Sequence, residues 1–211
     1  MKCESSIELK HQKEWTPEQY DAALRLVKRP LSKSPWLKMY CHALYLVADD
    51  MDRRPDDSRR ICDLGCGTGR FARMLFQSGY LAYTGIDFSH ARVAMARQYN
   101  RAYDIQGPGF VTGNLLDPRV QDLFGGCHLF VALEVFEHIR DDLDLLRAIP
   151  AGSVVVASVP NYAGPGSGHV RRFDCLTDVI LRYGGILDVT RSLVCPLNRK
   201  KQFYLFRGVT L

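Results

Sequence analysis

The chain has 211 residues and a net charge of +5; 46% of its residues are hydrophobic and 24% are charged. This composition excludes a disordered chain, and the length fits one domain with a small addition. No run approaches the roughly 18 apolar residues of a membrane span, and the first residues contain no apolar signal segment. The modest positive charge mildly favours an anionic partner.

Seven cysteines are scattered along the chain without any Cys-x-x-Cys pair. An odd number at such spacings argues against a disulfide framework and against a zinc knuckle. We therefore expect reduced thiols and a cytoplasmic protein.

Residues 1–57 are expected to form an N-terminal helical segment that covers the active site, with the polar residues 1–15 loose. Thr16-Pro17 and Ser34-Pro35-Trp36 are helix-start signals, because a hydroxyl side chain can cap the first turn and proline fits the first helical position. Apolar side chains follow each signal at helical spacing: Tyr20, Leu24 and Val27, then Trp36, Tyr40, Leu44 and Val47. A charged linker is expected over residues 49–60.

Residues 58–211 show a different pattern, in which short apolar runs alternate with helical ones. The runs expected to be strands are Ile61–Leu64, Tyr83–Ile86, Gly109–Thr112, His128–Leu133, Ser153–Val159, Ile186–Val194 and Gln202–Val209. Such alternation predicts a parallel sheet between two layers of helices. Only Cys195–Lys201 separates the last two runs, so they should pair antiparallel. The sequence thus predicts an α/β, Rossmann-like three-layer sandwich with a seven-stranded, mostly parallel sheet and an antiparallel C-terminal strand.

A glycine-rich turn, Asp63-Leu64-Gly65-Cys66-Gly67-Thr68-Gly69, directly follows the first of these strands. Glycines let the backbone turn sharply and let a ligand approach the main chain. A nicotinamide-binding turn would need its third glycine at position 70, which is Arg70, so a dinucleotide fits poorly. The alternative is a tight strand–helix connection that binds nothing.

Two further polar positions follow the next two strands. Asp87 lies about 20 residues beyond the glycines, where a carboxylate can accept both hydroxyls of a ribose. Gly113-Asn114-Leu115 combines a polar and an apolar side chain suited to the edge and face of an adenine. Asp87 could also be a plain helix cap before Ser89, but three such features at matching strand ends favour a nucleoside site.

With these motifs, residues 58–209 resemble the class I S-adenosylmethionine (SAM)-dependent methyltransferases. The resemblance implies that the backbone of residues 65–69 cradles the methionine part, that Asp87 binds the ribose, and that Asn114, where the family commonly has Asp, lies near the adenine amino group. The cofactor-binding residues it implies are Asp63, Gly65, Cys66, Gly67, Gly69, Asp87, Phe88, Asn114, Leu115 and Leu133.

Glu134, Glu137 and His138 follow the fourth strand of this domain. On a helical turn, this spacing would place all three side chains on one face. Two carboxylates and an imidazole can hold a divalent cation such as Mg²⁺, and His169 in a later loop could complete the site. Alternatively, Glu137 and His138 cap the following helix or touch the substrate.

The Glu-x-x-Glu-His pattern resembles two narrower families, the ubiquinone-pathway O-methyltransferases and the small-RNA terminal 2′-O-methyltransferases. The latter resemblance implies four metal ligands, Glu134, Glu137, His138 and His169. The RNA enzymes usually have a histidine-rich loop where this chain has His169-Val170-Arg171-Arg172-Phe173. This departure favours a small-molecule acceptor over RNA.

We therefore predict a methyltransferase that acts on a hydroxyl oxygen of a small molecule, with His138, His169 and Glu137 as catalytic residues. A hydroxyl must lose its proton to become a good nucleophile, and either a histidine or a bound cation can assist this. Arg171 or Arg172 could hold an anionic group of the acceptor. The alternatives are an RNA or nucleotide 2′-O-methyltransferase and a cofactor-binding module without catalysis.

Overall fold

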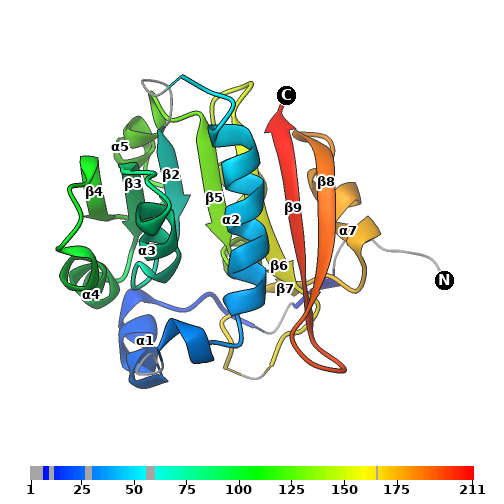
Figure 1. The fold of residues 1–211 in the computed structure, drawn as a ribbon. Coiled ribbons are helices and arrows are strands. Elements are labelled where there is room, and N and C mark those ends of the chain that lie inside the picture. Colours follow the sequence, from blue (N-terminus) through cyan, green and yellow to red (C-terminus); the bar gives the residue numbers. More distant parts are fainter. Residues whose placement is uncertain (1–6, 10–11, 27–29, 56–59, 165) are drawn as a thin grey trace.

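The computed structural model describes residues 7–9, 12–26, 30–55, 60–164 and 166–211. Within them lies a seven-stranded sheet in the order β4-β3-β2-β5-β6-β9-β8 (Figure 1). The strands are β2 (Ile61–Leu64), β3 (Ala82–Asp87), β4 (Gln106–Thr112), β5 (Leu129–Leu133), β6 (Val154–Pro160), β8 (Leu187–Pro196) and β9 (Gln202–Thr210). Strands β2 to β6 pair parallel, whereas β9 runs antiparallel to both neighbours. The α/β fold predicted from the sequence is confirmed.

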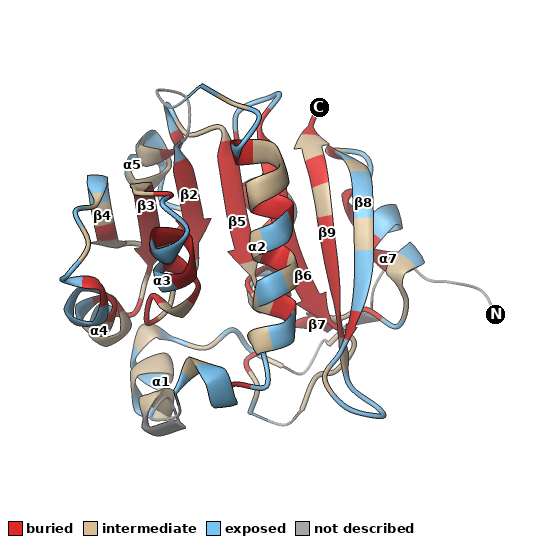
Figure 2. Ribbon diagram, viewed as in Figure 1, coloured by how far each residue is buried: buried red, intermediate tan, exposed pale blue. Residues whose placement is uncertain are grey.

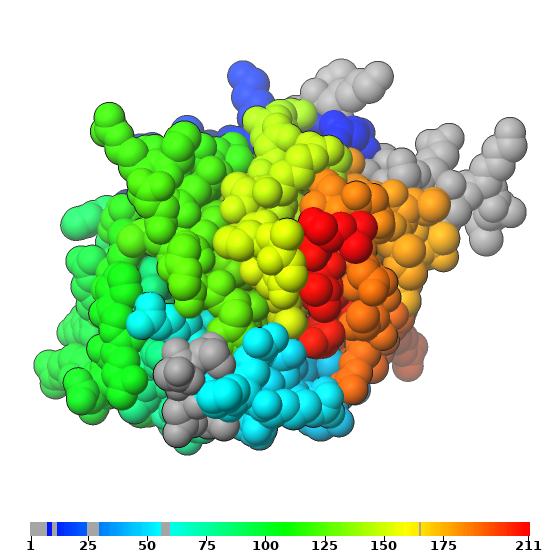
Figure 3. Space-filling model, turned by 90° about the horizontal axis from the view of Figure 1, so that it is seen from above, coloured from blue at the N-terminus to red at the C-terminus, as the bar shows by residue number. Residues whose placement is uncertain are grey.

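Helices cover both faces of this sheet, so its central strands are buried on both sides (Figure 2). One core packs α2 (Leu37–Met51), α3 (Arg70–Gln77) and α4 (His90–Asn100) against the sheet. The other core lies beneath α6 (Asp142–Arg147) and α7 (Leu176–Tyr183). Between β4 and β5 lie a short helix, α5 (Pro118–Gln121), and the one-turn helix η4 (Asp122–Phe124). Seen from the amino ends of the parallel strands, the yellow, red and orange parts of the chain lie side by side, in the order of β6, β9 and β8 (Figure 3).

The N-terminal segment begins its helices close to the predicted signals. Helix α1 (Pro17–Ala22) starts after Thr16, whose capping box is completed by Gln19, and continues into η1 (Ala23–Leu26). A second short turn, η2 (Leu31–Lys33), precedes α2. Val27, expected on the first helix, lies outside the described residues.

Two expectations about this segment are wrong. Helix α2 extends to Met51, so residues 49–51 are helical rather than part of a linker. Its buried face is made by Met39, Ala43, Leu46, Val47 and Met51, whereas Trp36 is 36% exposed. Of the stripe expected from Trp36, Tyr40, Leu44 and Val47, Val47 is buried and Tyr40 and Leu44 pack half-buried against the same core, so only Trp36 departs from it.

The expectation that residues 1–15 are loose is also wrong for the part that the structure describes. Strand β1 (Ile7–Glu8) pairs antiparallel with β7 (Arg171–Arg172), and the amide of Leu9 donates to the carbonyl of Val170 at 2.9 Å. A two-residue strand has no periodicity to reveal it, and its partner is more than 150 residues away.

None of the described helices is long and apolar enough to cross a membrane. Six of the seven cysteines fall within the described residues, and all six are free thiols.

Candidate active site

The turn between β2 and α3 depends on three glycines. Gly65, Gly67 and Gly69 have φ angles of 69°, 54° and 70°, in the left-handed region that side chains disfavour. A Cβ atom on Gly65 would lie 2.6 Å from Cγ2 of Val135. The amides of Gly65 and Cys66 both donate to the carbonyl of Ile86, at 2.7 and 3.0 Å. The turn is therefore held open and tied to the end of β3.

Asp87, the last residue of β3, uses both carboxylate oxygens to bind backbone amides. Oδ2 accepts from the amide of Gly67 at 2.9 Å, and Oδ1 accepts from the amide of Ser89 at 2.9 Å. Burial raises the pKa of this carboxyl, while the two amides and Arg92 oppose the rise. Asp87 thus joins the glycine turn to the start of α4, and each oxygen retains a lone pair for another donor.

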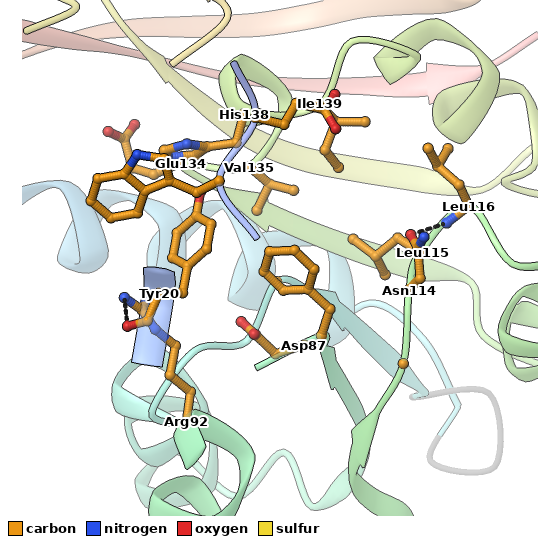
Figure 4. A pocket seen from close by; sticks show the side chains of 15 residues that line it. Tyr20, Asp87, Arg92, Asn114, Leu115, Leu116, Glu134, Val135, His138 and Ile139 are labelled. Carbon is orange, nitrogen blue, oxygen red and sulfur yellow. Dashed lines mark hydrogen bonds between the residues drawn. The ribbon is translucent and has the colours of Figure 1, made fainter. Parts of the chain in front are cut away.

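A cavity of about 170 Å³ opens at the carboxyl ends of the parallel strands (Figure 4). Seven of the site residues expected from the sequence line it: Gly65, Asp87, Phe88, Asn114, Leu115, Glu134 and His138. The cavity lining does not include Cys66, Gly67, Gly69 or Leu133, nor the predicted catalytic residues Glu137 and His169. Asp63 lies below the turn, where its carboxylate accepts from the Tyr83 hydroxyl at 2.7 Å. Burial raises the pKa of Asp63 to about 7.

Asn114 presents a defined side of its amide to the cavity. Its Oδ1 accepts from the amide of Leu116 at 3.0 Å, so its remaining hydrogen-bonding capacity is mainly the amide N–H₂ group. A donor at this position suits a ring nitrogen of an adenine better than its amino group, which is itself a donor.

The N-terminal segment forms the outer wall of the cavity. Tyr20 of α1 contacts the ring of Phe88 at 5.1 Å and the ring of His138 at 5.6 Å, and Arg92 lies 4.9 Å from its ring centroid. Trp15 packs edge-on against Tyr20 at 5.1 Å. Figure 4 shows Tyr20 between the group around His138 and that around Asp87. The Ser89 hydroxyl bonds to Asp21, which fastens α1 to the start of α4.

The residues after β5 do not form the helical turn that the sequence suggested. Glu134 has a φ of 60°, the sole positive φ of a non-glycine residue within the described ranges. The one-turn 3₁₀ helix η5 (Phe136–His138) then carries Glu137 and His138. The expectation of one helical face for all three is wrong, because Glu134 precedes the turn and is fixed separately by the Ser158 hydroxyl, 3.0 Å from its Oε1. Strained backbone of this kind is concentrated at functional sites.

Glu137, His138 and His169 nevertheless converge. One donor atom from each of the three lies within 4.8 Å of the other two, and the two imidazole rings are 4.6 Å apart. Nδ1 of His138 lies 3.1 Å from the carbonyl of Gly168, and Nδ1 of His169 lies 2.9 Å from the carbonyl of Tyr162. A carbonyl can only accept, so each Nδ1 carries the proton and each Nε2 retains its lone pair. The structure does not bring Glu134 into this three-residue group.

The cluster is unusual in its electrostatics. Both carboxylate oxygens of Glu137 are buried without a hydrogen-bond partner among the described residues. Burial raises the pKa of Glu137 well above its usual value, and the neighbouring Glu134 carboxylate adds to the effect. Burial also raises the pKa of Glu134 to about 8 and lowers that of His138 to about 3. The carboxyl of Glu137 and two neutral imidazoles form a donor set of three residues that suits a divalent cation.

The expected role of Arg171 as a clamp for an anionic acceptor is wrong. Its side chain is fully buried and forms ion pairs with Asp142 at 3.1 Å and with Glu8 at 3.6 Å. Arg172 is partly exposed and pairs with Asp174 at 3.1 Å. Arg171 therefore has no free charge to offer a substrate.

Sequence reasoning missed several residues of the cavity wall. Arg92, Glu14, Val135 and Ile139 line it, as do Gly113 and Leu116. An arginine in the first turns of a surface helix has no distinguishing signal. The aromatic content before residue 41 was a signal, and two of its members, Trp15 and Tyr20, do line the cavity.

Comparisons with known proteins agree with this geometry. Residues 62–151 match the family model described as a methyltransferase domain. No protein of curated function matches the sequence.

Three solved structures are similar to this one. Magnesium protoporphyrin IX methyltransferase (ChlM) from Synechocystis PCC 6803 with bound SAH has a TM-score of 0.66 and 18% identity, over 92% of this chain and 95% of that one. N-methyltransferase NodS from Bradyrhizobium japonicum WM9, also with S-adenosylhomocysteine (SAH), has a TM-score of 0.63 and 14% identity, over 91% and 98%. The methyltransferase domain of bacterial CtHen1-C has a TM-score of 0.59 and 17% identity, over 84% and 100%. This chain therefore shares the fold of these methyltransferases, and its residues 62–151 match a methyltransferase domain.

Proposed function

We propose that this chain binds SAM in the cavity and transfers its methyl group to a hydroxyl oxygen of a small-molecule acceptor. The observation that carries the proposal is that Asp87 and His138 wall the same cavity, so a nucleoside site and a proton-accepting cluster meet in one space. The solved relatives with SAH support the choice of cofactor.

The cofactor would lie along the edge of the sheet. Asp87 would accept hydrogen bonds from the ribose hydroxyls with the lone pairs that its amide contacts leave free. Phe88 and Leu115 offer apolar surface to the adenine, and the Asn114 amide offers a donor to a ring nitrogen. SAM supplies a methyl group already activated by its sulfonium, so the protein must chiefly align the acceptor oxygen.

We further propose that Glu137, His138 and His169, with Glu134 beside them, hold a divalent cation such as Mg²⁺. The fit rests on the two partnerless oxygens of Glu137 and on the convergence of one donor atom from each of the three residues within 4.8 Å. Each histidine is oriented by a backbone carbonyl on its other nitrogen, an arrangement typical of metal-binding imidazoles. A bound cation would lower the pKa of an acceptor hydroxyl, as in a catechol or vicinal diol.

The residues of this chain can also accept the proton themselves. His138 is neutral at physiological pH because burial lowers its pKa, so its Nε2 has a free lone pair, but the same burial makes it a weak base. Glu137 lies 3.8 Å from that nitrogen, and its ionised form would stabilise the imidazolium that results. His169 packs against the same ring, with 4.6 Å between the ring centroids, and lies behind His138 outside the cavity lining.

The test has two parts. Titration of the full chain with SAH should show saturable micromolar binding, and its absence would remove the proposal. Labelled SAM should then transfer its methyl group to catechol-type and other hydroxyl acceptors, and a metal chelator should abolish the transfer. Full activity in protein shown to be free of metal would refute the metal assignment and leave the histidines as bases.

A second candidate acceptor is the ribose 2′-hydroxyl of an RNA or nucleotide. The pairing of the Glu137–His138–His169 cluster with a fold similar to the CtHen1-C methyltransferase domain favours it. Binding to RNA phosphates releases counterions, so affinity for an RNA oligonucleotide should fall steeply as salt rises. A chain that binds SAH but transfers no methyl group to either class would instead be a cofactor-binding module.

A further inference from the structure

We infer that Arg171 is a positioning residue of this active site: its buried guanidinium fixes the turn that carries Glu137 and His138. The inference rests on the proposed function, because it concerns the residues offered there as metal ligands and proton acceptors. It assigns to Arg171 a task quite different from the substrate clamp suggested by its sequence.

The guanidinium donates to three backbone carbonyls in and directly after η5. Nη1 donates to the carbonyl of Phe136 at 2.5 Å and also to that of Ile139, and Nη2 donates to the carbonyl of Arg140 at 2.8 Å. Ile139 and Arg140 directly follow the one-turn helix, and the carbonyl of Phe136, its first residue, also accepts from the amide of Ile139 at 3.4 Å. A planar group with several donors in fixed directions can satisfy all three, whereas the single ammonium of a lysine cannot do so in the same geometry.

The segment before Arg171 makes two further contacts with the η5 turn. The amide of Val170 donates to the carbonyl of Glu137 at 2.8 Å, and the carbonyl of Gly168 faces Nδ1 of His138. His169 lies between these contacts. Placement of the loop therefore sets the position of all three residues of the cluster at once.

The charge of Arg171 is balanced from two distant parts of the chain. Asp142 of α6 is fully buried beside it, and Glu8 of β1 approaches from the opposite side. The pairing of β1 with β7 brings Glu8 there. Arg171 thus contacts three separate segments: strand β1, helix α6 and the η5 turn.

Arg182 provides a matched control. It shares both acidic partners, because its guanidinium lies 2.6 Å from Asp142 and 3.8 Å from Glu8. Its Nε and Nη2 donate to the Asp142 carboxylate at 2.9 and 2.6 Å, whereas Arg171 also donates to carbonyls of the η5 turn. Loss of either arginine should lower thermal stability, but only loss of Arg171 should disturb the cluster.

The experiment uses the full chain with Mn²⁺ as the metal probe and SAH as a control ligand. We expect Arg171→Met to weaken Mn²⁺ binding by about tenfold or more, as changes to groups that orient metal ligands do. SAH affinity should change by no more than about twofold. Arg182→Met should leave both affinities unchanged. Wild-type Mn²⁺ affinity in Arg171→Met would overturn the inference.

A second readout does not depend on metal. In protein with ¹⁵N-labelled histidine, Arg171→Met should shift the imidazole signals of His138 and His169, and Arg182→Met should not. If the wild type binds no Mn²⁺, the metal part of the proposed function fails, and unchanged imidazole signals in Arg171→Met would still overturn the inference. Should Arg171→Met fail to fold, Arg171→Lys decides by the same signals, because it keeps the charge and loses the three-carbonyl geometry.

Discussion

The amide of Gly67 donates to Oδ2 of Asp87 at 2.9 Å, across a separation of 20 residues in the sequence. The second oxygen of the same carboxylate accepts from the amide of Ser89, which begins the next helix. Asp87 therefore holds the glycine turn and the start of α4 in one arrangement around the cavity. A carboxylate is suited to this task because an amide side chain would offer one acceptor and one donor to two backbone donors.

The first prediction concerns this carboxylate. Asp87→Asn should weaken SAH binding by about 10- to 100-fold, since hydrogen bonds to a charged group contribute about 1.5–3 kcal/mol and one backbone amide would face a donor. Isothermal titration calorimetry measures the effect. Asp117→Asn is the control, because Asp117 also accepts from a helix-start amide, that of Arg119, but lies away from the cavity. Equal losses in both variants would contradict a role for Asp87 in cofactor binding.

The second prediction separates backbone strain from steric conflict in the glycine turn. Gly65 and Gly152 have φ angles of 69° and 78°, so Gly→Ala at either position introduces left-handed strain of about 1–2 kcal/mol. At Gly65 the new Cβ would lie 2.6 Å from Val135, whereas nothing lies within 4 Å of it at Gly152. Overpacking should add about 1–3 kcal/mol at Gly65 alone.

Chemical denaturation and SAH titration test this pair together. Gly65→Ala should lower the free energy of unfolding more than Gly152→Ala and should also weaken SAH binding, because Gly65 lines the cavity. Gly152→Ala should bind SAH as the wild type does. Identical behaviour of the two variants would mean that the Val135 side chain moves aside with no loss of stability.

The third prediction concerns Glu137, whose carboxylate is buried without a partner among the residues described. In metal-free protein, Glu137→Gln should raise stability relative to the wild type, increasingly so as pH rises, because the raised pKa marks an ionised form that the fold disfavours. With Mn²⁺ at about 100 times its Kd, the wild type should gain about 2.7 kcal/mol, and the variant should gain far less.

Thermal unfolding with and without Mn²⁺ measures both effects. Asp144→Asn is the control for loss of one negative charge, because Asp144 is exposed and pairs only with Arg147 in the contacts of α6. A variant that is less stable than the wild type without metal, and equally stabilised by it, would contradict the assignment of Glu137 as a ligand.

Much of the cofactor side could be predicted because its signals are local. Strand β2 occupies the run predicted for it. The glycines of the following turn adopt positive φ angles, which is the reason a glycine-rich sequence predicts a sharp turn there. Asp87 and Asn114 could be placed at one edge because parallel strands end together. The predicted set of cofactor-binding residues was less accurate for Asp63, whose side chain is bonded to Tyr83 and does not line the cavity.

The acceptor side could be predicted less well from the sequence, because it depends on contacts between distant segments. Burial of Arg171 requires Glu8 and Asp142, and nothing in the sequence around any of the three indicates the others. The spacing of Glu134, Glu137 and His138 suggested a helix, yet the left-handed backbone of Glu134 breaks it. Convergence of His169 with His138 arises from that long-range packing and not from a motif.

The last prediction concerns the buried pair of Asp63 and Tyr83. Burial raises the pKa of Asp63 from 3.8 to about 7, so the folded protein binds more protons than the unfolded chain between those pH values. The free energy of unfolding should therefore fall as pH rises from about 4 to 7, by at most about 4 kcal/mol from this group.

Asp63→Asn removes the titration, and the stability of the wild type relative to this variant should decline over the same window. Tyr83→Phe removes the hydroxyl that stabilises the carboxylate, so it should move the decline to higher pH. Urea unfolding at a series of pH values measures all three proteins, and a constant difference between wild type and Asp63→Asn would show that Asp63 is ionised in the fold throughout.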